Sequence, residues 1–238
     1  MLFFLCTFAA AKVGEMAKQS AIVIPDGCTR VLLHACCAPC SSAIVEWLLA
    51  HHIEPVIYYF NPNIYPFEEY EIRKNESKRH AESLGVKWIE ASGEWMKEHE
   101  EWRHDICGLE DEPERGKRCE ACFYHRLLAT ARKAQELGIP FFATTLASSR
   151  WKNLEQVNAT GENAAITAND TPHGCPASEP LRFWAQNWRK DGLQERRNQL
   201  LKEYDFYNQT YCGCEFSLSA RTRRDGTEPS DSGTTRQA

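Results

Sequence analysis

The sequence predicts an α/β protein with a parallel sheet and a helical C-terminal part. A short apolar run at 30–34 is followed by SAIVEWLLAHH, which has helical spacing, and then by a run at 54–60 rich in β-branched and aromatic residues. Strand, helix and strand in this order form a βαβ unit with helices on the faces of parallel strands. In such sheets, ligands bind where loops leave the carboxyl ends of the strands.

The same alternation continues to about residue 147. A charged helix is expected at about 66–84, and VKWIEA then predicts a third strand. An amphipathic helix is expected at 119–138, and IPFFATTL after it predicts a further strand. These elements extend the parallel sheet.

We expect a single catalytic domain at 30–218 between two extensions. The apolar start of segment 1–29 lacks a preceding basic segment and is too short to span a bilayer, so disorder is expected there, with a weak signal peptide as the alternative. Residues 157–180 are polar and predict an exposed loop with little order. The tail at 219–238 is rich in Ser, Thr, Arg and Gly and predicts disorder.

Charge and cysteine content exclude some classes of protein. A net charge of -5 argues against non-specific coating of nucleic acid, which needs a widespread positive field. Eleven cysteines, an odd number, fit a secreted disulfide framework poorly. Metal or redox work in the cytoplasm fits better, and no membrane partner is expected. Four cysteines lie outside the groups described next: Cys6, Cys28, Cys107 and Cys175.

The first cysteine group, HACCAPC at 34–40, lies where the first strand turns into a helix. Thiolates bind soft metals, and the free N–H groups at a helix start stabilise their negative charge. Buried cysteines acting as small apolar residues are the alternative. Three cysteines within five residues, beside a proline, favour a functional site.

The second group, Cys119 and Cys122, opens a predicted helix. A CxxC pair in this position can chelate zinc, ligate an iron-sulfur cluster or cycle as a disulfide. Together with Cys36 and Cys37 it offers four thiolates, a set that suits structural zinc or a 4Fe-4S cluster.

The third group is Cys212-Gly213-Cys214. Oxidation of this pair would close a small, strained ring, and strained disulfides are labile, which favours redox cycling. A second pair of metal ligands remains the alternative.

A basic stretch interleaved with tryptophans follows the polar segment. Arginines can hold phosphates and indoles can stack on bases, so this stretch could bind a single-stranded RNA loop. Two core tryptophans beside a solvated helix face explain the same composition equally well. The candidate contacts are Trp184, Trp188, Arg189, Lys190, Arg196 and Arg197.

These motifs, in this order, resemble the cobalamin-independent epoxyqueuosine reductases of the QueH family. The resemblance covers 31–218 apart from 157–180, in the segments LLHACCAPCSS, YYFNPNIYPFEEYEIRKNE, GLEDEPERGKRCEACFYHRL, TTLASSRWKN, FWAQNWRKDGLQERRNQL and YNQTYCGCEFSL. It implies a fold related to PP-loop and HUP-type nucleotide-binding folds. It also implies a 4Fe-4S cluster, a redox-active disulfide and no cobalamin. The cluster ligands carried over are Cys36, Cys37, Cys119 and Cys122, and the disulfide is Cys212 with Cys214.

The activity that the resemblance implies is reduction of epoxyqueuosine to queuosine at the wobble position of tRNA, in queuosine biosynthesis. An external donor of the ferredoxin or flavodoxin type would supply electrons. CCAPC replaces the phosphate-cradling glycines of the PP-loop, so no ATP use is expected. Where the family usually has Asp-Tyr-Asp, this chain has Ser92-Gly93-Glu94, so the additional iron that the resemblance allows lacks expected carboxylates.

Further candidates complete the hypothesis. Additional phosphate contacts are Arg73, Lys74, Arg150 and Lys152. Candidate proton donors are His34, Tyr65 and Glu110. Two rival interpretations remain: a zinc-stabilised RNA-binding module without catalysis, and a thiol-disulfide reductase that uses Cys119 and Cys122.

Overall fold

One five-stranded, wholly parallel sheet forms the centre of the protein. The computed structural model describes residues 22–170 and 179–225. The sheet order is β3-β2-β1-β4-β5. Its strands are β1 (Arg30–His34), β2 (Glu54–Tyr59), β3 (Lys87–Glu90), β4 (Phe141–Thr144) and β5 (Arg182–Phe183). The predicted α/β class with a parallel sheet is confirmed, and the relationship to nucleotide-binding folds stays a prediction.

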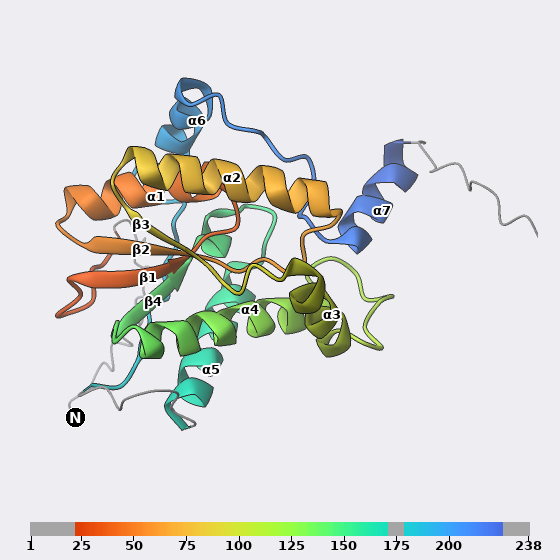
Figure 1. Ribbon diagram of the computed structural model, residues 1–238, viewed down its shortest axis with the longest axis horizontal. Helices are drawn as coiled ribbons and strands as arrows, with labels where there is room; N and C mark the ends of the chain where they lie inside the picture. The colour runs from red at the N-terminus through yellow and green to blue at the C-terminus, as the bar shows by residue number, and fades with distance from the viewer. Residues whose placement is uncertain (1–21, 171–178, 226–238) are drawn as a thin grey trace, which may run out of the picture.

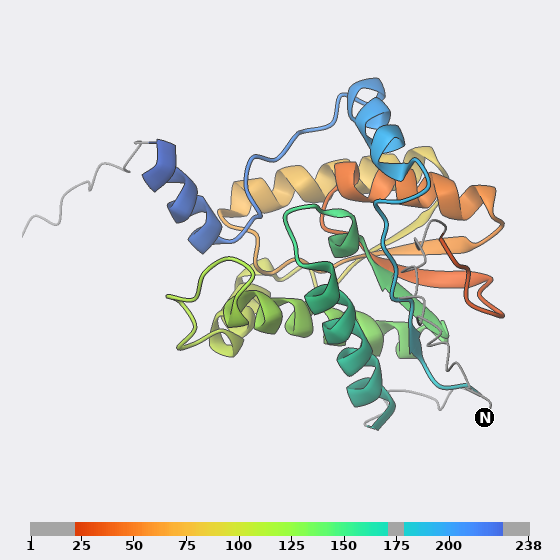
Figure 2. The ribbon, with the colours of Figure 1, turned by 180° about the vertical axis from the view of Figure 1, so that it is seen from behind.

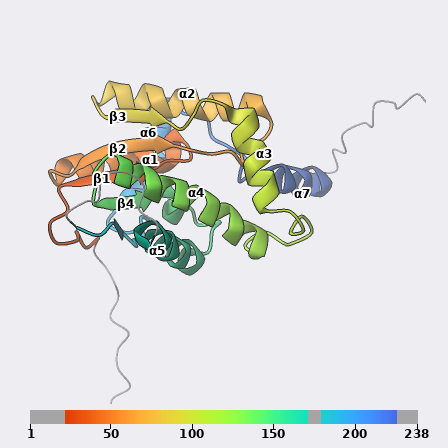
Figure 3. The ribbon, with the colours of Figure 1, turned by 60° about the horizontal axis from the view of Figure 1, so that its bottom comes forward.

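Helices cover both faces of this sheet (Figure 1). One face carries α1 (Ala38–Ala50), α2 (Phe67–Ser83) and α6 (Leu193–Glu203). The other face carries α4 (Lys117–Glu136) and α5 (Leu154–Asp170). Beyond the carboxyl ends of the strands lie α3 (Trp95–Asp105) and α7 (Glu215–Asp225), as Figure 3 shows. The central strands are therefore buried on both faces, which explains their nearly continuous apolar sequence.

The strand order places a switch point between β1 and β4. From β1 the chain enters α1 on one face, whereas from β4 it passes through a short 3-10 helix, η1 (Thr145–Ser148), to α5 on the other face. The two connections diverge and leave a crevice at the carboxyl ends of these strands, where α/β proteins bind their ligands. The CCAPC loop follows β1 directly, so its thiols lie at this crevice.

The expectation of a loop at 157–180 is wrong for the part that the structure describes. Helix α5 extends through Asp170, and Val157, Ala164 and Ala168 are fully buried. An added Cβ at Gly161 would overlap the Phe183 ring, so the small residue lets the helix pack closely on β5. The segment has few large apolar residues and so resembled a polar loop, but its small side chains allow close packing in a helix. Residues 171–178 lie outside the described residues.

The two extensions also differ from expectation where they are described. Ile22 and Cys28 are buried in the main core, and the Ile22 N–H donates to Asp191, so the domain begins before residue 30. Helix α7 continues to Asp225, inside the tail predicted to be disordered. Figure 2 shows the long connection from α6 that leads to this helix. Residues 1–21 and 226–238 lie outside the described part.

Within the described ranges, no helix combines the length and the apolar character needed to cross a bilayer.

Candidate metal and redox site

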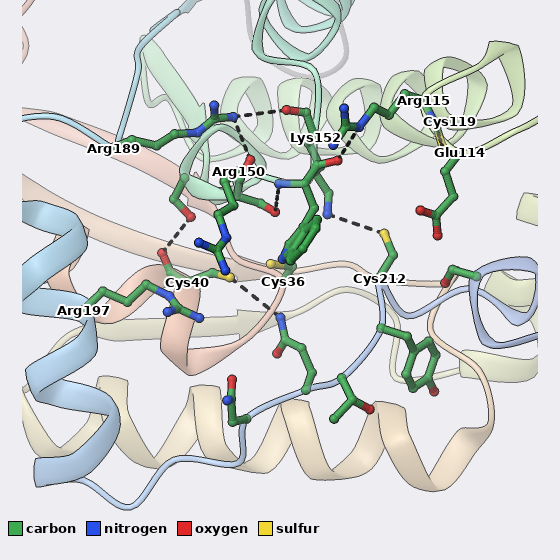
Figure 4. Close-up of a pocket in the computed structure, with 18 of the residues that line it drawn as sticks. Cys36, Cys40, Glu114, Arg115, Cys119, Arg150, Lys152, Arg189, Arg197 and Cys212 are labelled. Carbon is green, nitrogen blue, oxygen red and sulfur yellow. Dashed lines mark hydrogen bonds between the residues drawn. The ribbon is translucent and has the colours of Figure 1, made fainter. Parts of the chain in front are cut away.

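A cavity of about 660 Å³ opens at the switch point (Figure 4). Its wall is built from five parts of the chain: the loop from β1 into α1, the start of α4, the segment after β4, helix α6, and the segment that leads into α7. The volume lies in the usual range for small-ligand sites. Figure 4 shows Cys36, Cys40, Lys152 and Cys212 around this space, so cysteines far apart in the sequence share one site.

Three thiols of the CCAPC loop form a compact group. The Sγ atoms of Cys36, Cys37 and Cys40 all lie within 4.8 Å of one another, and those of Cys36 and Cys37 are 3.8 Å apart. Cys37 occupies the N-cap of α1, and a proline follows in the first turn, where its missing N–H costs no hydrogen bond. The helix start thus turns Cys40 back toward the two preceding thiols.

The three thiols of this group differ in pKa. Hydrogen bonds from Cys37 and Cys40 lower the pKa of the Cys36 thiol well below its usual value. Burial raises the pKa of Cys37 well above its usual value, and the hydrogen bond with Cys36 is the main cause that raises the pKa of Cys40 to about 11. Thr145 also contacts Cys36, 3.5 Å from Oγ1 to Sγ. The group therefore favours one thiolate, and a bound metal would replace the remaining protons.

The donor set fits a thiophilic metal centre. The 3.8 Å between the Sγ atoms of Cys36 and Cys37 equals the edge of a tetrahedron with metal–sulfur bonds of about 2.3 Å. Thiolates also hold iron-sulfur clusters, so the geometry suits both kinds of centre.

The CxxC pair opens α4 and faces two environments. Cys119 lines the cavity, and its Sγ accepts from the Arg115 N–H at 3.2 Å. Burial raises its pKa to about 11, with a smaller contribution from the charge of Cys212. Cys122 is buried with Trp102 and Ile106 beneath α3. The pair lies outside the compact group of three, and its participation in a four-thiolate set stays a prediction.

Cys212 and Cys214 are free thiols in different surroundings. Cys212 is exposed and lines the cavity, whereas Cys214 packs against the Trp102, Ile106 and Cys122 cluster. Burial, followed by the charge of Cys212, raises the pKa of Cys214 to about 12. The pair therefore connects the cavity with the protein interior, and its redox activity stays a prediction.

A buried arginine holds this pair in place. The Arg73 guanidinium donates to the carbonyl oxygens of Cys212 at 3.2 Å and Tyr211 at 3.3 Å. Glu69 balances its charge, with Nη2 and Oε1 2.6 Å apart. The Arg73 side chain is only 1% exposed, so the expectation that it contacts phosphate is wrong.

Lys74 also departs from the phosphate hypothesis, because its ammonium pairs with Glu71 of α2 and with Glu90 at the end of β3. Arg150 and Lys152, by contrast, do line the cavity.

Lys152 connects the first and third cysteine groups. Its Nζ lies 3.4 Å from the Cys212 Sγ. Burial opposes the ammonium charge, yet Cys212, Cys36 and Cys40 raise the pKa of Lys152 above its usual value. A charged ammonium is therefore held among the thiols.

The predicted RNA stretch needs correction. Trp184 and Trp188 are 3% and 2% exposed, and Trp188 packs edge-on against both Trp47 and Trp184, so the two are core residues and cannot stack on bases. Arg196 donates to both carboxylate oxygens of Glu46, at 2.7 Å and 2.9 Å. The alternative interpretation of this stretch, two core tryptophans beside a solvated helix face, is therefore correct for the tryptophans. Indole side chains are more often buried than exposed to a ligand.

The other cations of this stretch have separate roles. Arg189 donates to the carbonyls of Ser149 at 2.6 Å and Lys152 at 3.1 Å, and so fixes the segment after β4. Arg197 lines the cavity, whereas Lys190 is exposed and lies outside the cavity lining.

The three predicted proton donors are not at the cavity. His34 is fully buried, 2.8 Å from Thr144 Oγ1 and 3.1 Å from the Phe60 carbonyl. Burial, and then the nearby Arg126, lower its pKa to about 3, so it stays neutral. Tyr65 and Glu110 are exposed and are not part of the cavity lining.

Sequence reasoning missed two features of the site. Cys40 was placed in the first cysteine group but not among the metal ligands, although it lies three residues after Cys37, a spacing that puts both on one side of a first helical turn. Trp151 is 70% exposed at the cavity, although its segment had drawn attention only for its cations. Residues 92–94 lie outside the cavity lining, and Ser92 instead bonds to Glu98.

Comparison with known proteins identifies the family. The family model "Epoxyqueuosine reductase QueH" matches residues 31–220. The QueH protein of Haemophilus influenzae is 42% identical over 195 residues, which cover 82% of this chain and 74% of that protein. The QueH proteins of Acinetobacter baylyi and Thermotoga maritima are 40% and 34% identical, over 84% and 82% of this chain and 85% and 93% of theirs. The chain therefore belongs to the epoxyqueuosine reductase QueH family.

Proposed function

We propose that this protein reduces epoxyqueuosine to queuosine at the wobble position of tRNA. The observation that carries the proposal is the convergence of Cys36, Cys40, Cys119 and Cys212 on one cavity with the charged Lys152. An enzyme that transfers electrons to a bound substrate needs a metal centre and a source of electrons at the same cavity. Metal-binding thiols and a pair that alternates between dithiol and disulfide meet these two needs. The family relatives carry the name of this activity.

Four cysteines would hold the cofactor. We assign a 4Fe-4S cluster to Cys36, Cys37, Cys119 and Cys122, and no cobalamin. When bound, such a cluster supplies electrons one at a time next to the cavity. Cys40 remains beside this set as a thiol donor for the additional iron that the family resemblance allows.

The chain's own residues would manage electrons and protons. Removal of the epoxide oxygen takes two electrons and two protons and releases water. Oxidation of the Cys212 and Cys214 dithiol to a disulfide yields two electrons and two protons, so one cycle of this pair balances one reduction. A ferredoxin or flavodoxin type donor would then reduce the disulfide, for which the exposure of Cys212 provides access.

Lys152 would donate a proton to the leaving oxygen. Its Nζ holds a proton in the cavity, 3.4 Å from the Cys212 sulfur. Protonation of the oxygen as its C–O bond breaks is general acid catalysis, which needs a donor within hydrogen-bond reach. Lys152 therefore replaces His34, Tyr65 and Glu110 as the proposed proton donor.

Anaerobic purification with iron, sulfide and zinc analysis tests the cofactor. We expect about four irons and four sulfides per chain, as a cubane requires, and conversion of epoxyqueuosine-containing tRNA with a reduced donor, measured by nucleoside mass spectrometry. Metal-free protein with full activity would refute the cluster assignment. Iron-loaded protein that leaves epoxyqueuosine unchanged would refute the activity.

A zinc-stabilised RNA-binding module is the second candidate, because the 3.8 Å spacing between the Cys36 and Cys37 sulfurs suits tetrahedral zinc as well as a cluster. It predicts colourless protein with stoichiometric zinc that binds tRNA without changing it. Either function would operate in the cytoplasm, where tRNA is found and reducing conditions preserve free thiols such as those here.

A further inference from the structure

An exposed tryptophan lies at the edge of the cavity. Trp151 lines it, and 70% of its side chain is accessible. Indoles contribute large apolar contact areas and are usually buried, so an exposed one beside a ligand cavity indicates a contact made only in a complex. The other aromatic residues of the lining are Phe123, which is buried, and Tyr211, which is partly buried, so this indole is the most exposed aromatic side chain there.

The backbone that carries Trp151 is braced. The Arg115 Nε donates to the Trp151 carbonyl at 2.8 Å, and the Trp151 N–H donates to Ser149 Oγ at 3.3 Å. Arg189 holds the carbonyls of Ser149 and Lys152 on either side. The indole is therefore presented from a fixed support, which reduces the entropy lost when a ligand binds to it.

The surroundings of Trp151 are strongly positive. The guanidinium carbon of Arg150 lies 5.1 Å from the centre of the indole ring. Six cations and one carboxylate, that of Glu114, line the cavity in a chain whose net charge is -5. The cations are Arg115, Arg150, Lys152, Arg189, Arg197 and Arg221. Such a concentration of positive charge around a concave site attracts polyanions.

We propose that Trp151 stacks on an unpaired base of the RNA loop, while Arg150 and Arg197 contact neighbouring phosphates. The inference rests on the proposed function, which makes a tRNA anticodon loop the ligand. Recognition of unpaired RNA combines an aromatic face for the base with cations for the backbone, and this cavity edge offers both. The role foreseen for Trp184 and Trp188 thus passes to a tryptophan on a different segment.

Binding of a fluorescein-labelled anticodon stem-loop, measured by anisotropy with intact metal-loaded protein, tests this inference. Trp151→Ala should weaken binding about tenfold or more, the range typical for loss of a base-stacking aromatic. Trp151→Phe should retain most of the affinity, because a phenyl ring also stacks. Met96→Ala is the matched control, since Met96 is an equally open apolar side chain, 65% exposed, outside the cavity lining.

Two further measurements separate stacking from charge. A fully paired RNA duplex has no unpaired base to stack, so its weaker binding should be unaffected by Trp151→Ala. Arg197→Met should reduce the slope of log affinity against log salt by about one, as for a lost phosphate contact, whereas Trp151→Ala should leave the slope unchanged.

The outcomes distinguish this inference from the proposed function. Wild-type protein that does not bind the stem-loop at all would refute the RNA substrate itself. Wild-type binding that Trp151→Ala leaves unchanged would overturn the stacking role and leave the substrate standing. Equal losses for stem-loop and duplex would also overturn it, because the effect would not depend on an unpaired base.

Discussion

The CCAPC loop and the Cys212-Gly213-Cys214 segment are both rich in thiols, but the fold holds them in different ways. The first follows the central strand β1 and continues as α1, so its three sulfurs are positioned by adjacent residues of one chain segment. The second is positioned by Arg73 and by the Tyr65 N–H, which donates to the Gly213 carbonyl at 2.8 Å.

This difference separates two chemical tasks. Buried sulfurs that converge within 4.8 Å suit permanent metal binding. An exposed Cys212 next to a partly buried Cys214 suits a pair that reacts at the cavity and is then reduced from outside. The two regions should therefore fail independently when mutated, and the predictions below test that independence.

The largest effect is expected from Cys37→Ser. Serine is nearly isosteric and is a preferred N-cap, so α1 should persist while a metal ligand is lost. Metal content and activity should fall by more than about 100-fold, since even outer-shell changes around metals cost 10–100-fold. Metal analysis and single-turnover assays measure this loss. The exposed Cys107→Ser is the control, and normal metal content in Cys37→Ser would contradict the assigned site.

The double variant Cys212→Ser, Cys214→Ser should affect turnover alone. We expect unchanged metal content, no conversion by pre-reduced protein in the absence of a donor because the two electrons of the dithiol are missing, and a fall of about 100-fold or more in the steady-state rate. Single-turnover and multiple-turnover rates on the same sample separate these effects. Full multiple-turnover activity would refute the relay.

Gly213→Ala should disturb the second region through its backbone. The φ angle of Gly213 is +126°, and an added Cβ would lie 2.9 Å from the Arg73 guanidinium. We expect a loss of about 1–3 kcal/mol in unfolding free energy, the cost of a strained backbone position, together with slower turnover at normal metal content. Denaturant unfolding measures the first quantity.

Gly108→Ala is the matched control for this variant. Gly108 has a φ of +81° but nothing within 4 Å of its added Cβ, so it reports backbone strain without the contact with Arg73. Equal turnover in the two variants would show that the Arg73 contact does not position the thiols.

The smallest of these effects is expected on the alkylation rate of Cys212 in Lys152→Met. The substitution keeps the length of the side chain but removes the cation 3.4 Å from the Cys212 sulfur. Alkylation of Cys212 by iodoacetamide near neutral pH should slow by up to about tenfold, because the variant lacks the cation that contacts the attacking sulfur. Peptide mass mapping follows the rate. The exposed Lys190→Met should leave the rate unchanged, and an equal change in both variants would exclude a specific effect of Lys152.

The sequence predicted the central strands well because strands covered by helices on both faces are continuous apolar segments, which are recognisable in the local sequence. The runs at 30–34 and 54–60 became β1 and β2, and the intervening periodic segment became α1. Helix α5 was missed because Gly161, Ala164 and Ala168 pack closely without providing the large apolar residues that a helical pattern requires.

The sequence by itself determined the parallel α/β fold, the family and the thiol cluster of the CCAPC loop that could hold a metal, because each depends on neighbouring residues. Only the tertiary structure decided which tryptophans and cations face the cavity. Trp184 and Trp151 are both tryptophans with arginines and lysines nearby in the sequence. Trp184 is buried because it packs against Trp47, whereas Trp151 is exposed on a backbone segment that Arg115 holds in place. Solvent exposure depends on contacts between distant segments, which no local pattern records.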